Sequence, residues 1–118
     1  MKRFALIAVV ALLPSAAMAA DFNARIVNVD GTPLKDDAGK EVTLTVRTVT
    51  MNALLAPYKD ESELPADEKV RRGRLAMKIS NGETGGIAGD DIVLIKKLVN
   101  RYYASPLVVT QTFDALDK

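Results

Sequence analysis

The feature that most constrains this chain is its first twenty residues, which decide how much of the sequence is left to fold. Two positive charges, Lys2 and Arg3, precede an apolar run over residues 4–13. Small residues follow, and this order of charge, apolar run and small-residue exit is typical of a secretory signal peptide. Ala17 and Ala19 form the best pair for the cleavage signal. We therefore expect cleavage after Ala19.

Residues 1–19 are thus predicted to be a signal peptide, and residues 20–118 a single small domain. One alternative is a leader retained as a membrane anchor. Residues 4–20 would rise only about 25 Å as a helix, against a bilayer core of roughly 30 Å, and Pro14 interrupts the run. A second alternative is a buried core helix, which gives the small-residue exit no role. After cleavage no stable membrane insertion is expected.

The composition of the remaining chain limits its partners. The full sequence has 16 basic and 15 acidic residues, and loss of Lys2 and Arg3 leaves 14 against 15. A nearly neutral domain has no bulk attraction to nucleic acid or to an anionic membrane, so neither is an expected partner. Because the chain contains no cysteine, an exported domain must rely on its apolar core without disulfides. The leader makes the periplasm or the exterior of a bacterium the expected destination.

The first half of the mature chain predicts β-structure. Residues 41–50, EVTLTVRTVT, alternate apolar and polar side chains, a period typical of a strand with one buried face. Residues 22–29 are a second, less regular candidate. Turn residues between the two segments predict a hairpin with its tip at residues 36–39 and a short strand through Pro33 and Leu34.

The second half predicts helices. Pro65 suits the first turn of a helix running to about Ile79. We expect its apolar stripe at four positions, Ala66, Val70, Gly73 and Met77. Residues 80–89 are expected to be a loop.

A stronger helix is expected to begin at Asp90 and Asp91 and to be the central helix of the domain. Its expected core positions are Ile92, Leu94, Ile95, Leu98, Val99 and Tyr102. Ser105 and Pro106 suit the start of a last helix, whose apolar edge is Val109, Phe113 and Leu116. The predicted fold class is α+β, a small single domain with an N-terminal β-hairpin followed by about three helices.

The residue types exclude most enzyme chemistry. The chain has no histidine, so the commonest general base, the serine and cysteine triads and the usual zinc ligands are missing. We interpret residues 36–37 as turn residues, residues 90–91 as helix capping residues and residues 60–63 as a solvated acidic linker. The spacing in DDAGKE does not fit a calcium loop, and the glycines of residues 82–89 do not fit a phosphate loop. No enzyme activity, cofactor or metal is expected.

Basic side chains gather on the two longer predicted helices. The functional interpretation is a surface for an anionic partner, and the alternative is a solvated helix face. The candidate partner-binding residues are Arg71, Arg72, Arg74, Lys78, Lys96, Lys97 and Arg101.

Four phrases over about residues 24–116 resemble small proteins encoded by tailed bacteriophages and prophages. They are NVDGTPLKDDAGKEVTL, NALLAP, DEKVRRGRLAMKI and DDIVLIKKLVNRYYASPLVVTQTFDAL. The resemblance brings no assigned activity and implies a phage-derived accessory protein that acts by binding. The proteins of this kind usually begin near the first strand, so the leader is a departure and suggests a product exported to the cell envelope.

Three functional hypotheses follow. The first is an exported, non-enzymatic interaction protein that contacts an unidentified protein partner through the hairpin edge or the basic helix faces. The second is a cytoplasmic or membrane-anchored phage assembly or regulatory protein. The third, an enzyme using carboxylate chemistry, would need a pocket with two facing carboxylates. The oligomeric state is left open.

Overall fold

The computed structural model describes residues 20–87 and 89–118, and the predicted signal peptide lies outside the described residues. The described part contains a two-stranded antiparallel hairpin and four α-helices, where about three had been expected. The elements are β1 (Leu34–Lys35), β2 (Glu41–Val42), α2 (Val46–Leu55), the short 3-10 helix η1 (Lys59–Glu61), α3 (Ala66–Asn81), α4 (Asp90–Tyr102) and α5 (Pro106–Leu116). This confirms the α+β prediction in its coarse form.

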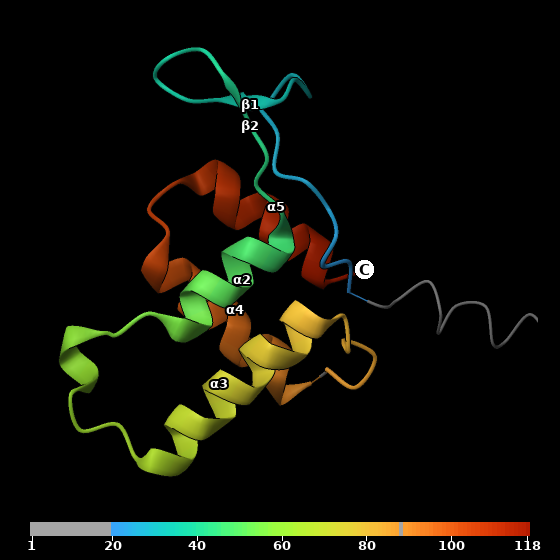
Figure 1. Ribbon diagram of the computed structural model, residues 1–118. Helices are drawn as coiled ribbons and strands as arrows, with labels where there is room; N and C mark the ends of the chain where they lie inside the picture. Colours follow the sequence, from blue (N-terminus) through green and yellow to red (C-terminus); the bar gives the residue numbers. More distant parts are fainter. Residues whose placement is uncertain (1–19, 88) are drawn as a thin grey trace, which may run out of the picture.

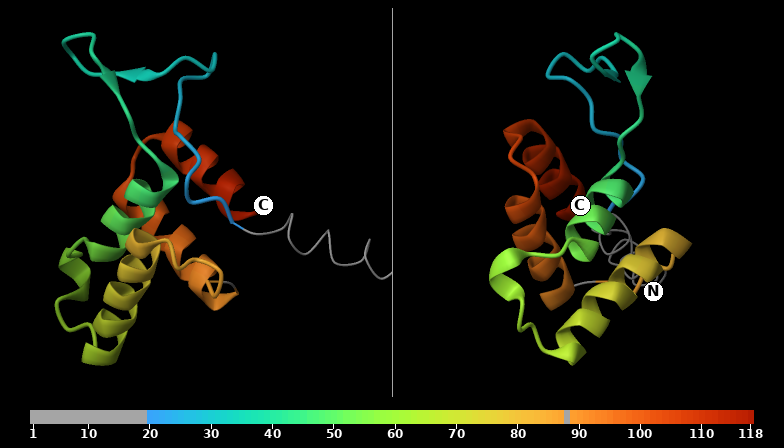
Figure 2. Two further views of the ribbon diagram at one scale, coloured as in Figure 1. Left: turned by 45° about the vertical axis from the view of Figure 1, so that its right-hand side comes forward. Right: turned by 60° about the vertical axis from the view of Figure 1, so that its left-hand side comes forward.

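The hairpin projects from one end of the helical body (Figures 1 and 2). Its strands pair Leu34 with Val42 in antiparallel register. The carboxylate of Asp36 accepts hydrogen bonds from the backbone N–H groups of Ala38 and Lys40, each at 2.9 Å. Gly39 has a φ of 80°, a conformation that glycine adopts without a steric penalty. The predicted tip at residues 36–39 and its interpretation as turn chemistry are confirmed.

The segment before the hairpin, residues 22–29, contains two isolated bridges and no strand, with turns at residues 22–23 and at residue 29. The bridges join Arg25 to Thr45 and Val27 to Pro33. The backbone of this segment caps the start of α2. The carbonyl of Ala24 accepts a hydrogen bond from the N–H of Val46 at 2.9 Å, and the carbonyl of Phe22 accepts one from the N–H of Arg47 at 2.8 Å. These are first-turn amides that have no partner within their own helix. Phe22 and Ile26 insert their side chains into the core.

The strand predicted over residues 41–50 is wrong beyond Val42, because α2 begins at Val46. The hydroxyl of Thr45 accepts a hydrogen bond from the N–H of Thr48 at 3.3 Å and caps the helix. The buried positions follow helical spacing, i, i+3, i+4, i+7 and i+8. They are Val46, Val49, Thr50, Ala53 and Leu54. Thr50 satisfies its hydroxyl by donating to the Val46 carbonyl at 2.9 Å, so a β-branched polar residue is accommodated inside the helix.

The sequence predicted α4 as the central helix, but α2 holds that position in the structure. In the described structure the larger contacts of α2 are with three helices, α3, α4 and α5, whereas the larger contacts of α4 are with α2 and α5. Ile95, Leu98 and Val99 of α4 are fully buried, as expected. Tyr102 was assigned to the same face but is exposed, because α4 ends there and Tyr103 turns toward the core instead.

The bounds of α3 agree with prediction, but its buried face does not. The helix starts after Pro65 and ends at Asn81, where Gly82 adopts a left-handed φ of 78°. The buried residues are Arg72, Leu75, Ala76 and Ile79, so the stripe predicted through Val70 and Met77 faces solvent. The bulkier Leu75 and Ile79 pack with the apolar residues of α2, and this contact decides which face is covered.

The start of α5 agrees with prediction. Ser105 accepts a hydrogen bond from the N–H of Val108 at 3.4 Å, and Pro106 is the first helical residue. Leu116 is buried as expected, while Val109 and Phe113 are only partly buried against the core. Among residues 20–87 and 89–118, none of the helices combines the length and the apolar character needed to cross a membrane.

Candidate functional site

The seven basic residues singled out in the sequence lie on α3 and α4, and the structure divides them into two groups. Four are tied to acidic residues of the same chain, namely Arg71, Arg72, Lys96 and Arg101. In the part of the chain that the structure describes, Arg74, Lys78 and Lys97 form no ion pair. The predicted patch is therefore not one continuous charged surface.

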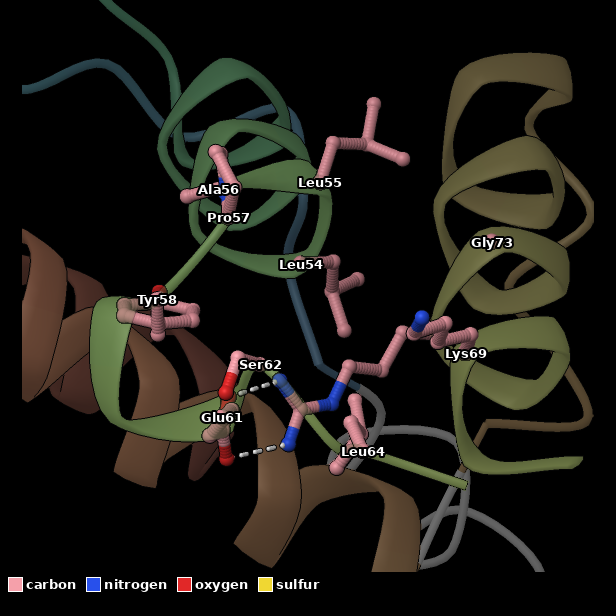
Figure 3. A pocket seen from close by; sticks show the side chains of 11 residues that line it. Leu54, Leu55, Ala56, Pro57, Tyr58, Glu61, Ser62, Leu64, Lys69 and Gly73 are labelled. Carbon is pink, nitrogen blue, oxygen red and sulfur yellow. Dashed lines mark hydrogen bonds and ion pairs between the residues drawn. The ribbon is translucent and has the colours of Figure 1, made fainter. Parts of the chain in front are cut away.

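Arg72 is a structural residue, with only 7% of its surface exposed. Its Nη1 and Nη2 atoms donate to the two carboxylate oxygens of Glu61 at 2.8 and 3.0 Å, a fork that Figure 3 draws as dashed lines. The hydrogen bonds from Arg72 lower the pKa of Glu61, and the same bonds raise the pKa of Arg72. Arg72 is not available to a partner at the surface. The interpretation of Glu61 as part of a solvated linker is also wrong.

Arg101, on α4, also contacts the connection between α2 and α3. It pairs with Asp60, its Nη1 lies 3.3 Å from a carboxylate oxygen of Glu61, and its guanidinium lies 4.4 Å from the centre of the Tyr58 ring. The Tyr58 hydroxyl lies 2.7 Å from the carbonyl oxygen of Ala53 on α2 and 3.2 Å from that of Leu98 on α4. Burial raises the pKa of Tyr58. Two arginines on one carboxylate thus fix the connection between α2 and α3.

Two further cations have partners within the chain. Arg71 donates to Asp91 at 3.1 Å, and Lys96 pairs with Asp117 and lies 5.4 Å from the ring centre of Phe113. Asp91 lies in the first turn of α4, but no side-chain capping bond is present there, because Gly89 occupies the N-cap position. The predicted capping role is therefore limited to the favourable charge of the carboxylates.

The remaining cations of α3 lie on its solvent side. Val70, Arg74, Met77 and Lys78, here called the α3 outer face, recur at helical spacing opposite the buried stripe. Val70 is 50% exposed and Met77 is 65% exposed. Arg74 and Lys78 line two shallow surface hollows, one shared with Val70 and the other with Met77. The sequence identified these cations but assigned the two apolar residues to the core.

A cavity of about 360 Å³, which was not predicted from the sequence, lies on another flank of α3. Figure 3 shows the end of α2, the connection after it and the near side of α3 around this space, here called the α2–α3 cavity. Its apolar walls include Leu54, Leu55, Pro57 and Leu64. The available signal was Gly73, a glycine inside a predicted helix, which lines this cavity and leaves it without a side chain there.

Comparison with protein-family models, curated proteins and solved structures gave no match to this chain. Within the described residues, no three side chains of the metal-ligating types histidine, cysteine, aspartate and glutamate come together.

Proposed function

We propose that this protein is a non-enzymatic binding protein whose α3 outer face holds an acidic segment of a protein partner. The proposal is carried by one observation: two exposed cations without an ion pair in the described chain, Arg74 and Lys78, share one face of α3 with two exposed apolar side chains. Arg71 beside them is already neutralised by Asp91 and Glu68.

The chemistry of this face favours a partner with both acidic and apolar side chains. Cations attract and orient an acidic partner, while contact between apolar side chains supplies the non-polar centre that protein interfaces need. The two hollows lined by Arg74 and Lys78 offer positions for side chains of the partner. Met77 adds an unbranched, adaptable contact, a property useful on binding surfaces.

The setting that we propose is the periplasm or the cell exterior, with a prophage as the origin of the gene. The proposal of export is supported by the charge, apolar run and alanine exit of residues 1–19, and that of origin by the phrases in residues 24–116. The alternative is a cytoplasmic or membrane-anchored phage accessory protein. Intact mass of the protein from fractionated cells separates these settings, because a periplasmic species beginning at Ala20 supports export and a full-length cytosolic species contradicts it.

The binding proposal is tested by reversing the charges of the α3 outer face. Tagged wild type, the Arg74→Glu, Lys78→Glu double variant and a control double variant, Lys35→Glu with Lys40→Glu, are used to capture proteins from separate envelope and cytosolic fractions. The control makes the same charge change on the hairpin, where both lysines are exposed.

We expect a specific protein to be captured by wild type and control and reduced several-fold with the α3 variant, with capture weakening as salt is raised. An equal set of captured proteins for wild type and the α3 variant contradicts the proposal. Far-ultraviolet circular dichroism of each variant checks that the helices are retained.

A further inference from the structure

The α2–α3 cavity is large enough and apolar enough to hold a small molecule. Its volume of about 360 Å³ falls within the roughly 300–1,000 Å³ of known small-molecule sites. Leucines from both sides of the connection, Leu54, Leu55 and Leu64, form the walls together with Pro57. Leu55 is mostly exposed, so an occupant would cover apolar surface that is now in contact with water.

The walls of the cavity are held in place without an occupant. The hydroxyl of Tyr58 joins the connection to a carbonyl of α2, and the fork between Glu61 and Arg72 joins it to α3. Arg101 adds a second cation on Glu61 at 3.3 Å. A site that is already ordered loses less conformational entropy when a ligand binds.

The polar groups of the cavity have an unbalanced positive charge. Lys69 lines it and has no ion pair within the described chain, while the charge of Glu61 is matched by Arg72. The Nε–H group of Arg72 is buried and pairs with a carboxylate oxygen of Glu68 at 3.6 Å. Since this Nε–H faces the Glu68 carboxylate as an ion pair, Lys69 is the cation of the lining that has no acidic partner in the described chain.

We propose that the α2–α3 cavity binds an aliphatic monocarboxylate, with its chain against the leucines and its carboxylate facing Lys69. One negative charge balances the lining, and an alkyl chain matches the apolar walls. This site is separate from the α3 outer face and does not depend on the function proposed above.

The test is titration of the full mature domain with decanoate and, separately, with 1-decanol, followed by backbone amide NMR signals. Gly73→Leu is the blocking variant, since its new side chain enters open space and leucine favours a helix over glycine. Lys69→Gln removes the proposed carboxylate partner. Lys59→Gln is the control, as an exposed lysine on η1 that does not line the cavity.

We expect saturable decanoate binding that shifts the signals of cavity residues, is lost or weakened at least about tenfold by Gly73→Leu, and is unchanged by Lys59→Gln. Lys69→Gln should weaken decanoate about three- to fivefold and leave 1-decanol unaffected, as for a partly exposed ion pair. Absence of saturable decanoate binding, or equal binding by a folded Gly73→Leu variant, overturns the proposed site. An equal effect of Lys69→Gln on both probes overturns the carboxylate assignment.

Discussion

The hairpin and the helical body are built by different means, although they belong to one short chain. Residues 28–43 contain no buried residue, whereas each of the four α-helices contributes several to one core. The hairpin is held by local hydrogen bonds, such as those of Asp36 and those between Asn28 and Thr32. The body is held by burial of apolar surface, which is the larger stabilising term in folded proteins.

The two regions meet at a small joint. The side-chain amide of Gln111, on α5, accepts from the N–H of Val27 at 3.0 Å and donates to its carbonyl at 2.7 Å, as a neighbouring strand would. Ile26 lies next to it and reaches the core. The difference between the regions predicts that the body can keep its structure when the hairpin loosens, and that the reverse does not hold.

The largest loss of stability is expected from a substitution in the core of the helical body. Ile95→Asp places a charge at a position with 0% exposure, and an unpaired buried charge costs several kcal/mol, comparable with the roughly 5–15 kcal/mol that stabilise a whole domain. We expect loss of cooperative thermal unfolding by circular dichroism. The control is Val93→Asp, on the exposed side of the same helix, with an effect within about 0.5 kcal/mol. A cooperatively melting Ile95→Asp variant would show that α4 is not part of the core.

Loss of the ion pairs of Glu61 with Arg72 and Arg101 should have an intermediate, pH-dependent effect on the free energy of unfolding. Glu61→Gln removes a charged hydrogen-bond acceptor of Arg72 and should lower the free energy of unfolding by about 2 kcal/mol at pH 7. Arg72 lowers the pKa of Glu61 in the folded state. The stabilisation is therefore fully present above the ordinary glutamate pKa of about 4.3 and is lost as the pH falls below it.

Urea denaturation at pH 7 and pH 3 measures this dependence. The difference between wild type and Glu61→Gln should shrink at the lower pH, while Glu63→Gln, an exposed neighbour, should differ little from wild type at either pH. A difference for Glu61→Gln that does not change with pH would contradict the assigned role of the carboxylate.

Loss of the hydrogen bonds between Gln111 and Val27 should lower the stability less, and its effect on hydrogen exchange should be confined to the hairpin. Gln111→Ala removes both hydrogen bonds to Val27 and should cost about 1–2 kcal/mol. Amide hydrogen exchange should accelerate over residues 27–42 and remain slow in α2 and α4, because the core is not altered. Thr110→Ala, an exposed neighbour on α5, is the control. Equal acceleration in the body would show that the two regions unfold as one unit.

The smallest effect is expected at the tip of the hairpin. Asp36→Ala removes the carboxylate that accepts from two turn amides, with an expected change in the free energy of unfolding below about 1 kcal/mol. Exchange at the N–H groups of Ala38 and Lys40 should increase, and the melting temperature should barely move. Asp37→Ala, at the next position, should leave these amides unaffected. A large fall in melting temperature would mean that the hairpin supports the body.

The parts of the fold that follow from local chemistry were predictable from the sequence. The tip at residues 36–39 and the start of α5 at Ser105 depend on hydrogen bonds between residues at most four positions apart. The secondary structure of residues 46–50 was not predictable in the same way, because Val46 continues the strand-like alternation of Val42 and Leu44 and also begins the helical spacing with Val49. The choice depends on carbonyls of residues 22 and 24, far away in the sequence, which accept the first amides of α2.

The candidate site shows the same limit. The sequence placed Arg71, Arg72, Arg74 and Lys78 on one helix, and the structure confirms that helix. Which of these cations faces solvent depends on partners at a distance, such as Glu61 for Arg72, eleven positions away. The stripe through Val70 and Met77 was misassigned because apolar spacing alone does not say which face a neighbouring helix covers.

The contact between the two ends of the described chain has a consequence for folding rate. The N–H of Asp21 donates to the carbonyl of Ala115 at 2.9 Å, and the neighbouring Phe22 belongs to the same core as Leu116. This part of the core closes only after nearly the whole chain has been synthesised, and its formation requires closure of a very long loop. A ribosome-bound chain lacking α5 therefore cannot complete the core.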